Sequence, residues 1–293
     1  MAENRRRRRV LPVLLTAAGI LAAVLLYGFL SSLSLRTVRY FVEAKVSEPI
    51  RIVHLTDLHN RQFGDQNETL VARVVEQQPD LIIMSGDMLN ADNPNTDVVT
   101  ALIKNLCTVA PILFGYGNHE KSWETAFEQD LRPILEEAGA VVVDNDYVDM
   151  ELNGTLLRIG GYAGYYPVPH MTTHDEAQQK LELAFVADFE NTDRLKILIN
   201  HIPTGWIDWE YVNKYPVDLI FSGHYHGGTI RIPFFNQGLC APYVGWFPTF
   251  TKGVFAGEKA TCILSSGLGN EHSIPRINNP PEIVIVDLIP FPH

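Results

Sequence analysis

Five short apolar runs between residues 50 and 221 set the pattern of this chain. They cover residues 50–55, 81–84, 111–114, 197–199 and 219–221. Uninterrupted apolar runs of this length are typical of parallel strands that are buried on both faces. Between them the spacing becomes helical, first at Leu70, Val71, Val74 and Val75 and then over residues 98–109 and 123–138. This alternation predicts an α/β fold with a mainly parallel sheet covered by helices.

The pattern changes after residue 139. Short β-like runs at 141–143, 148–152 and 156–159 are separated by turn residues, which predicts a second sheet that contains a hairpin. Residues 177–189 predict another helix, and 283–289 a closing strand. The simplest assembly is two stacked sheets flanked by helices.

Each of the first five runs ends at residue types that bind metals. In chain order these are Asp57 and His59, Asp87, Asn118 and His119, His201, and His224 and His226. Because function gathers at the carboxyl ends of strands in open α/β sheets, we expect these side chains at one edge of one sheet. Mixed Asp and His ligands favour Zn, Fe or Mn over Ca, which prefers oxygen ligands. The set therefore predicts a two-metal site.

A two-metal site needs one carboxylate that bridges both ions. Two ions about 3.5–4 Å apart can clamp the attacking and leaving oxygens of a phosphate ester. The pair Gly86-Asp87 fits the bridge, because glycine allows a sharp turn that brings the metal close to the backbone.

In this order, the motifs Asp57-x-His59, Gly86-Asp87, Gly117-Asn118-His119-Glu120, His201 and Gly223-His224-x-His226 resemble the calcineurin-like metallophosphoesterases. Gly227-Gly228 and the segments 265–269 and 280–283 resemble the bacterial exported or membrane-anchored branch. The resemblance implies a four-layer αββα sandwich and hydrolysis of phosphate mono- or diesters by a metal-bridging hydroxide.

The resemblance also implies residue roles. The first metal would take Asp57, His59, Asp87 and His226, and the second Asp87, Asn118, His201 and His224. The ions would be Mn, Fe, Zn or Mg. His119 would act as a catalytic residue that stabilises charge or protonates the leaving oxygen, and with Asn118 it would contact the substrate. Arg61 is either a further phosphate ligand or a solvated surface residue.

One position departs from the family pattern. Many members have a carboxylate three residues after the bridging aspartate, where it orients the catalytic histidine, and here that position is Asn90. An amide stabilises an imidazolium less than a carboxylate does. The partner of His119 is then Asn90 or Asp92, or His119 is less basic.

The N-terminus predicts a membrane anchor. Residues 10–35 carry no formal charge, and about 20 such residues suffice to cross a bilayer as a helix. Because Arg5 to Arg9 stand directly before this stretch, we expect residues 1–9 in the cytoplasm and the rest outside. Residues 36–49 would be a connecting strand or linker, and 50–293 the catalytic domain. The alternative is a cleaved signal peptide.

Charge narrows the range of substrates. The chain has 23 basic and 34 acidic side chains, and six of the basic and one of the acidic side chains lie in residues 1–36. The body therefore has 17 basic and 33 acidic side chains, a net charge of −16. Because phosphate repels so acidic a body, nucleic acid is not a favoured partner. Two rival functions stay open: a nuclease or cyclic-nucleotide phosphodiesterase, and a non-catalytic anchored sensor. We predict no protein partner.

Two segments could shape substrate choice. Tyr243, Trp246, Phe247 and Phe250 follow the last motif and either touch a bilayer or acyl chain, or pack in the core. Lipid or cell-envelope substrates are therefore among the expectations. Residues 162–174 form either a rim over the metals or an ordinary loop.

Overall fold

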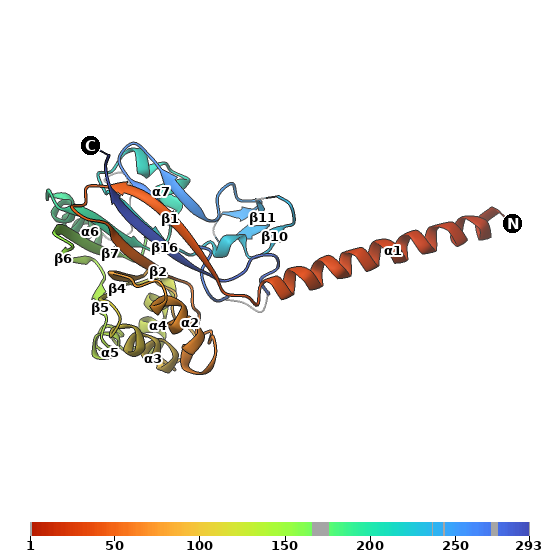
Figure 1. Ribbon diagram of the computed structural model, residues 1–293, viewed down its shortest axis with the longest axis horizontal. Helices are drawn as coiled ribbons and strands as arrows, with labels where there is room; N and C mark the ends of the chain where they lie inside the picture. The colour runs from red at the N-terminus through yellow and green to blue at the C-terminus, as the bar shows by residue number, and fades with distance from the viewer. Residues whose placement is uncertain (1, 166–175, 236, 243, 271–274, 293) are drawn as a thin grey trace.

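Two six-stranded sheets form the body of the protein in the computed structural model, which describes residues 2–165, 176–235, 237–242, 244–270 and 275–292 (Figure 1). In spatial order the first sheet contains β1 (Arg36–Ala44), β16 (Glu282–Pro290), β2 (Ile50–Leu55), β3 (Leu81–Met84), β4 (Ile112–Gly115) and β5 (Val141–Val143). The second contains β14 (Gly253–Ala256), β15 (Thr261–Leu264), β9 (Leu219–Ser222), β8 (Leu195–Asn200), β7 (Thr155–Tyr162) and β6 (Asp146–Leu152).

The two sheets pack face to face. Ile52 and Ile83 of the first sheet share one buried cluster with Ile197 and Phe221 of the second. Successive side chains of a strand point to opposite faces, so the neighbouring residues of β2 and β3 face away from this inner core. Burial on both faces explains why these strands are mostly apolar runs.

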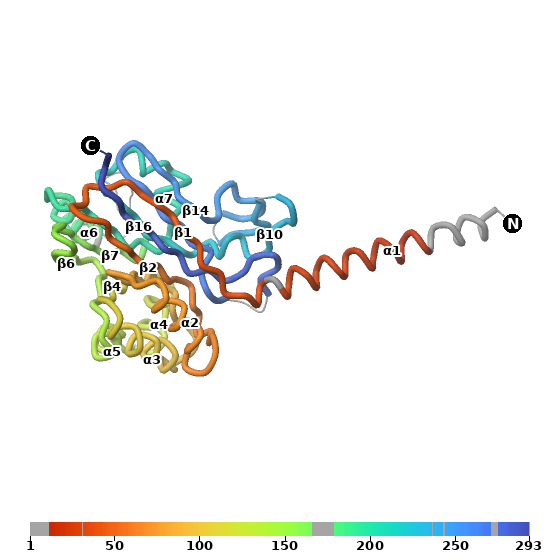
Figure 2. Tube along the Cα trace, in the orientation of Figure 1, coloured from red at the N-terminus to blue at the C-terminus, as the bar shows by residue number. Residues whose placement is uncertain are grey.

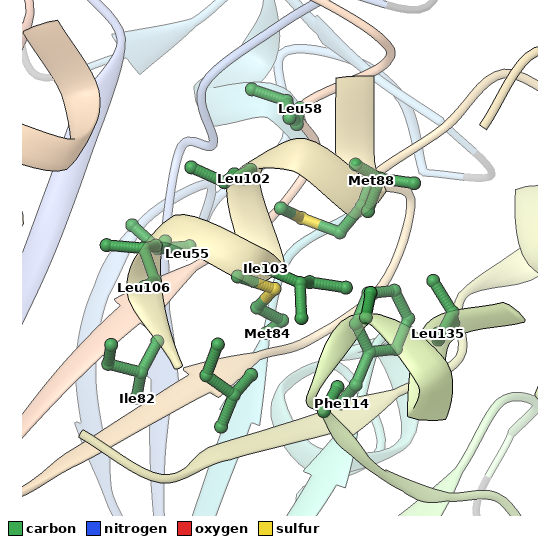
Figure 3. Packing of buried hydrophobic residues seen from close by; sticks show 14 of the residues in the cluster. Leu55, Leu58, Ile82, Met84, Met88, Leu102, Ile103, Leu106, Phe114 and Leu135 are labelled. Carbon is green, nitrogen blue, oxygen red and sulfur yellow. The ribbon is translucent and has the colours of Figure 1, made fainter. Parts of the chain in front are cut away.

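Helices cover both outer faces. The first sheet is covered by α2 (Glu68–Val75), α3 (Asp97–Leu106), α4 (Asn118–Phe127) and α5 (Arg132–Ala138), whose apolar side chains pack against the strands (Figure 3). The second is covered by α6 (Glu176–Glu190) and α7 (Thr204–Ile207). Short 3₁₀ turns lie at Asp65–Asn67, Tyr211–Asn213 and His226–Gly228. The predicted four-layer αββα sandwich is confirmed.

Two sequence-based elements differ from the structure. The helix predicted over 123–138 is two helices, because α4 ends before Glu128, whose φ of 50° is left-handed, and α5 begins at Arg132 with Pro133 in its first turn. Residues 141–143 pair in parallel with β4 and so belong to the first sheet, not the second. The predicted hairpin is confirmed, since β6 and β7 pair antiparallel.

The segment from Arg36 to Ala44 is a strand of the sandwich. It pairs in parallel with β16 over its whole length, and Val42, Ala44 and Val46 are buried between the sheets. Of the expected connecting strand or linker over residues 36–49, residues 36–44 are therefore a strand. Every second residue from Val38 to Ala44 is apolar and the residues between them are more exposed, as expected of a strand with one solvated face.

A single long helix, α1 (Ala2–Ser31), projects from one end of the body (Figures 1 and 2). Its segment Pro12–Leu30 is long and apolar enough to cross a membrane, which fits either an anchor or a signal sequence. The base of the helix touches the body, because the backbone N–H of Asn278 donates to the carbonyl of Gly28 at 3.0 Å.

Two small antiparallel ribbons lie near the base of α1 (Figure 1). They are formed by β10 (Arg231–Ile232) with β11 (Gln237–Gly238), and by β12 (Cys240–Ala241) with β13 (Gly245–Trp246). Large aromatic side chains around them are solvent-exposed: Phe234, Phe235, Trp246, Phe247 and Phe250. Of the four aromatics that the sequence analysis considered, Trp246, Phe247 and Phe250 are therefore not core residues, and Tyr243 lies outside the described residues.

Substitutions on β1 test whether it belongs to the sandwich. We expect Val42→Asp to lower the free energy of unfolding by about 3 kcal/mol, since it buries a charge between the sheets. Thermal unfolding of the full chain would then shift down by roughly 6–12 °C. The matched control is Phe41→Asp, because Phe41 is 67% exposed on the same strand. Equal melting temperatures for the two variants would contradict the strand assignment.

Candidate metal centre

The predicted ligand segments meet where the carboxyl ends of five strands converge. Three follow β2, β3 and β4 of the first sheet, and two follow β8 and β9 of the second. The expectation of one edge of one sheet is therefore wrong, since the site is shared between two sheets. Apolar runs look alike in both sheets, so the sequence pattern does not reveal which strands pair.

Backbone contact between two loops brings the central motifs together. A Cβ atom at Gly86, whose φ is 92°, would collide with the backbone of Gly117, and one at Gly117 would collide with Asp87. Only glycine allows this approach. As a result the backbone N–H of His119 donates to Asp87 Oδ1 at 2.8 Å.

Ligand atoms from these loops form three overlapping groups, within each of which the atoms lie within 4.8 Å of one another. The groups are Asp57, His59 and His226; Asp87, His201 and His224; and His59, Asp87 and His119. The first two match the metal sites that the resemblance implies, and the third connects Asp87 to the first. All of these side chains are buried.

Hydrogen bonds select the nitrogen atom that each ligand histidine presents. His201 Nδ1 donates to the carbonyl oxygen of Ser85 at 2.7 Å, and His59 Nδ1 donates to Asn90 Oδ1 at 3.0 Å. Their Nε2 atoms then carry the lone pair that a metal needs. His59 Nε2 is buried and has no hydrogen-bond partner among the described residues. Such an orphaned atom fits a metal ligand.

Asn118 is the remaining predicted ligand. It is the first residue of α4, and its Oδ1 is also buried without a hydrogen-bond partner in the described part of the chain. Buried polar atoms are normally paired, so this oxygen is available to a cation.

Electrostatics in the site also suit metal ions. Burial lowers the pKa of His59 to about 4 and the pKa of His226 well below its ordinary value, so both imidazoles are neutral ligands. Burial and the nearby Asp87 raise the pKa of Asp57 to about 6. A cation beside these groups would favour the carboxylate and accept the nitrogen lone pairs.

Of the aspartate–histidine pairs in the site, Asp87 and His201 lie closest together. Asp87 Oδ2 lies 2.9 Å from His201 Nε2. Burial alone would raise the pKa of Asp87, but His201 lowers it below its ordinary value, and Asp87 raises the pKa of His201 in turn. In a metal-bound site a cation would replace the proton between these two ligand atoms.

Glu120 holds the two central loops together. Its carboxylate accepts the backbone N–H groups of Asp87 at 2.7 Å, Met88 at 2.8 Å and Gly117 at 2.8 Å, and it is completely buried. These contacts give Glu120 a role in positioning both loops.

Among the described hydrogen bonds, Asn90 pairs with His59 and not with His119. The ring of His119 accepts the backbone N–H of Ala91 at Nδ1, at 3.1 Å. Asn90 instead binds His59, through the Nδ1 contact above and by donating its amide to the backbone carbonyl of His59 at 3.2 Å. The residue three positions after Asp87 thus orients a metal ligand in this chain.

Arg61 lies beside the ligands rather than among them. Its Nη1 donates to the carbonyl oxygen of Leu268 at 3.1 Å, and its guanidinium lies over the Phe63 ring, 4.6 Å from the centroid. It lines a separate pocket with Arg276. Of the possible rim at 162–174, residues 166–174 lie outside the described residues.

Sequence reasoning missed Asn279, which the structure connects to the ligand loop. Its amide donates to the backbone carbonyl of His226 at 2.7 Å and to that of Thr229 at 3.2 Å. The Asn-Asn-Pro-Pro stretch at 278–281 predicts a turn and carries no metal-ligand signal.

Comparison with known proteins agrees with this geometry. The uncharacterized metallophosphoesterase YkuE of Bacillus subtilis is 27% identical over 93% of this chain and 93% of its own length. The phosphodiesterase YaeI of Escherichia coli is 25% identical over 82% of this chain and 83% of its own length. The UDP-2,3-diacylglucosamine pyrophosphatase LpxG of Chlamydia muridarum is 25% identical over 81% of this chain and 83% of its own length.

The family model of the calcineurin-like phosphoesterases matches residues 50–228, a stretch that begins at β2 and ends just after the His224 and His226 motif. More than half of the chain is thereby covered, with every predicted ligand inside the match. The chain belongs to the calcineurin-like phosphoesterase family, whose members are metal-dependent hydrolases of phosphoester bonds.

Proposed function

We propose that this protein is a membrane-anchored, extracytoplasmic phosphoesterase that hydrolyses phosphate mono- or diesters with two divalent ions. The observation that carries the proposal is the pair of buried ligand groups, Asp57–His59–His226 and Asp87–His201–His224, with Asp87 also grouped with His59. Asp87 would bridge the ions and Asn118 would complete the second site. Mn, Fe, Zn and Mg all suit such a set.

The bound ions would supply Lewis-acid polarisation of the phosphate and lower the pKa of water. The protein residues do the rest. Glu120 keeps Asp87 and Gly117 in contact, and the bonds of Asn90 to His59 and of Ser85 to His201 fix the two imidazoles. Together they hold the ligand atoms in place before a substrate arrives.

Two contacts of His119 support a role as proton donor. Its Nδ1 accepts the N–H of Ala91, so the neutral ring carries its proton at Nε2. The ring belongs to the group formed with His59 and Asp87, next to the proposed ions. We therefore assign it the protonation of the leaving oxygen, or stabilisation of the charge that develops there.

The substrate is proposed to be a lipid or cell-envelope phosphate ester. The exposed aromatics Phe234, Phe235, Trp246 and Phe247 lie in or beside the two small ribbons, and the β10–β11 ribbon lies near the base of α1. Aromatic side chains favour the interface between membrane and water. The relatives named as a phosphodiesterase and as a diacylglucosamine pyrophosphatase support an ester with a second substituent.

Paired variants test the catalytic assignment. We expect the full chain in detergent to hydrolyse chromogenic phosphate esters only after chelated metal is restored. Asp87→Asn should lose metal and reduce turnover by about 10³-fold or more. His119→Ala should retain both ions and lose roughly 10²–10⁴-fold, because only the proton donor is missing. Metal content by mass spectrometry and initial rates would be measured together.

The ratio of the rates with monoester and diester substrates would define the ester class, and a phospholipid-like diester in vesicles would test the lipid assignment. Full metal occupancy without turnover on any of these substrates would favour the sensor function. Unchanged turnover of His119→Ala would remove its assigned role.

Glu120→Gln tests the loop-locking contact. One amide oxygen cannot accept three N–H groups, and the amide NH₂ would face donors, so we expect a loss of about 1–3 kcal/mol in unfolding free energy. Metal retention should fall with it, whereas Glu128→Gln, an exposed change at the end of the same helix, should alter neither. Thermal melts with and without chelator would show the difference, and identical melts would contradict this role of Glu120.

An N-terminal tag tests the anchor. We expect tag and body to stay in one polypeptide in the membrane fraction, with the body accessible to protease added outside the cell, because the Arg5–Arg9 cluster keeps the N-terminus inside. Replacing Leu21 and Leu25 with arginine should abolish membrane retention. Release of the tag from the body would instead show a cleaved signal peptide.

A further inference from the structure

A pocket of about 290 Å³ lies where α1 meets the body. Phe29, Ser32 and Leu33 line it from the end of α1, and Arg61 and Arg276 line it from the body. It therefore combines an apolar wall with two cationic side chains. These five residues define what we call the junction pocket.

The guanidinium of Arg276 is buried without a carboxylate partner. Only 2% of the residue is exposed, and its Nε and Nη2 donate to the backbone carbonyls of Ser266 and Gly269. Its Nη1 is buried and has no hydrogen-bond partner among the described residues. A buried charged donor left unpaired is costly, and Arg276 lines the pocket, so an anion there would compensate the charge of its guanidinium group.

Arg61 places a second positive charge on the same pocket. Within the described ranges, neither Arg61 nor Arg276 has a carboxylate at ion-pair distance, unlike Arg51, which lies 2.7 Å from Asp287. Burial lowers the pKa of Arg276 to about 10. The carboxylates of Asp57 and Glu282 offset part of that shift, and the neighbouring positive charge of Arg61 adds to it, so the two like charges repel. A phosphate oxygen between two planar guanidinium groups would relieve this repulsion and accept bidentate hydrogen bonds.

The position of the pocket along α1 points to a lipid. The apolar segment that could cross a membrane is Pro12–Leu30, and the pocket is lined by residues just before and after its C-terminal end. If that segment spans the hydrocarbon core, residues 29–33 lie at the depth of the lipid headgroups. Phe29 and Leu33 are 44% and 56% exposed, so they offer apolar surface to acyl chains.

We propose that the junction pocket binds the phosphate group of an anionic membrane lipid, a proposal that depends on the proposed anchoring by α1. The bound lipid would hold the metal edge of the body at the bilayer surface. The base of α1 is already connected to that edge, since the backbone N–H of Asn279 donates to Ser32 Oγ at 3.4 Å while its side chain binds the His226 carbonyl.

The test is lipid binding by the full chain in non-ionic detergent, measured by native mass spectrometry after metal chelation. Chelation separates this site from the metal centre, so the result does not depend on catalysis. We expect phosphatidylglycerol to bind at least tenfold more tightly than phosphatidylcholine with the same acyl chains. Arg61→Gln should reduce that binding about tenfold, and Arg61→Lys should restore part of it.

Arg73→Gln is the matched control, because it removes an equal charge from the exposed face of α2. Lipid held by Arg5–Arg9 remains in every variant and cancels from the comparison. An equal loss of phosphatidylglycerol binding in Arg61→Gln and Arg73→Gln would show that only the net charge matters, and it would overturn the proposal. Unchanged binding in Arg61→Gln would also overturn it. Inorganic phosphate that binds as tightly as phosphatidylglycerol would overturn the lipid assignment.

Discussion

The buried carboxylate of Asp87 is the contact on which the rest of the site depends. It stands at the end of β3 in one sheet, meets His201 from the end of β8 in the other, and accepts the N–H of His119 at the start of α4. Leaving one member of a buried charged pair unpaired costs several kcal/mol. The two sheets can therefore stack only in the register that brings these loops together. Burial of the inner apolar core stabilises the packing of the two sheets. The contacts of Asp87 specify how the sheets are aligned.

The order of the predicted ligands could be read from the sequence because they follow mostly apolar runs. Asp57, Asp87 and His201 were predicted this way, and β2, β3 and β8 do precede them. The sequence did not show how those strands are divided between two sheets, because the apolar pattern of a buried strand is the same in both sheets. Glu120 and Asn90 were visible as residues, but their partners were not. The hydrogen-bond partners of these two side chains depend on how the loops approach each other, as they do at the contact between Gly86 and Gly117.

The base of α1 and the metal edge are parts of one hydrogen-bonded region. Asn279 touches Ser32 at the end of the helix and the backbone of His226 in the ligand loop, while Asn278 binds Gly28. A Cβ atom at Gly28 would collide with Ile277, so the helix approaches this segment as closely as its backbone allows. The junction pocket and the β10–β11 ribbon, whose Arg231 donates its backbone N–H to the carbonyl of Ile277, both lie beside this base.

Strain at the ligands supports a site formed before any ion binds. Asp57, His59, Asp87, His224 and His226 all have φ between 47° and 70°, a region that costs non-glycine residues of order 1–3 kcal/mol each. Such conformations persist only where the surroundings impose them, and here the two-sheet core and the carboxylate of Glu120 do so. Small metal-dependent domains behave differently, since their ions provide the folding energy itself. In this protein the ions would instead compete with protons, because Asp57 and His201 both have raised pKa values and must lose their protons to become ligands.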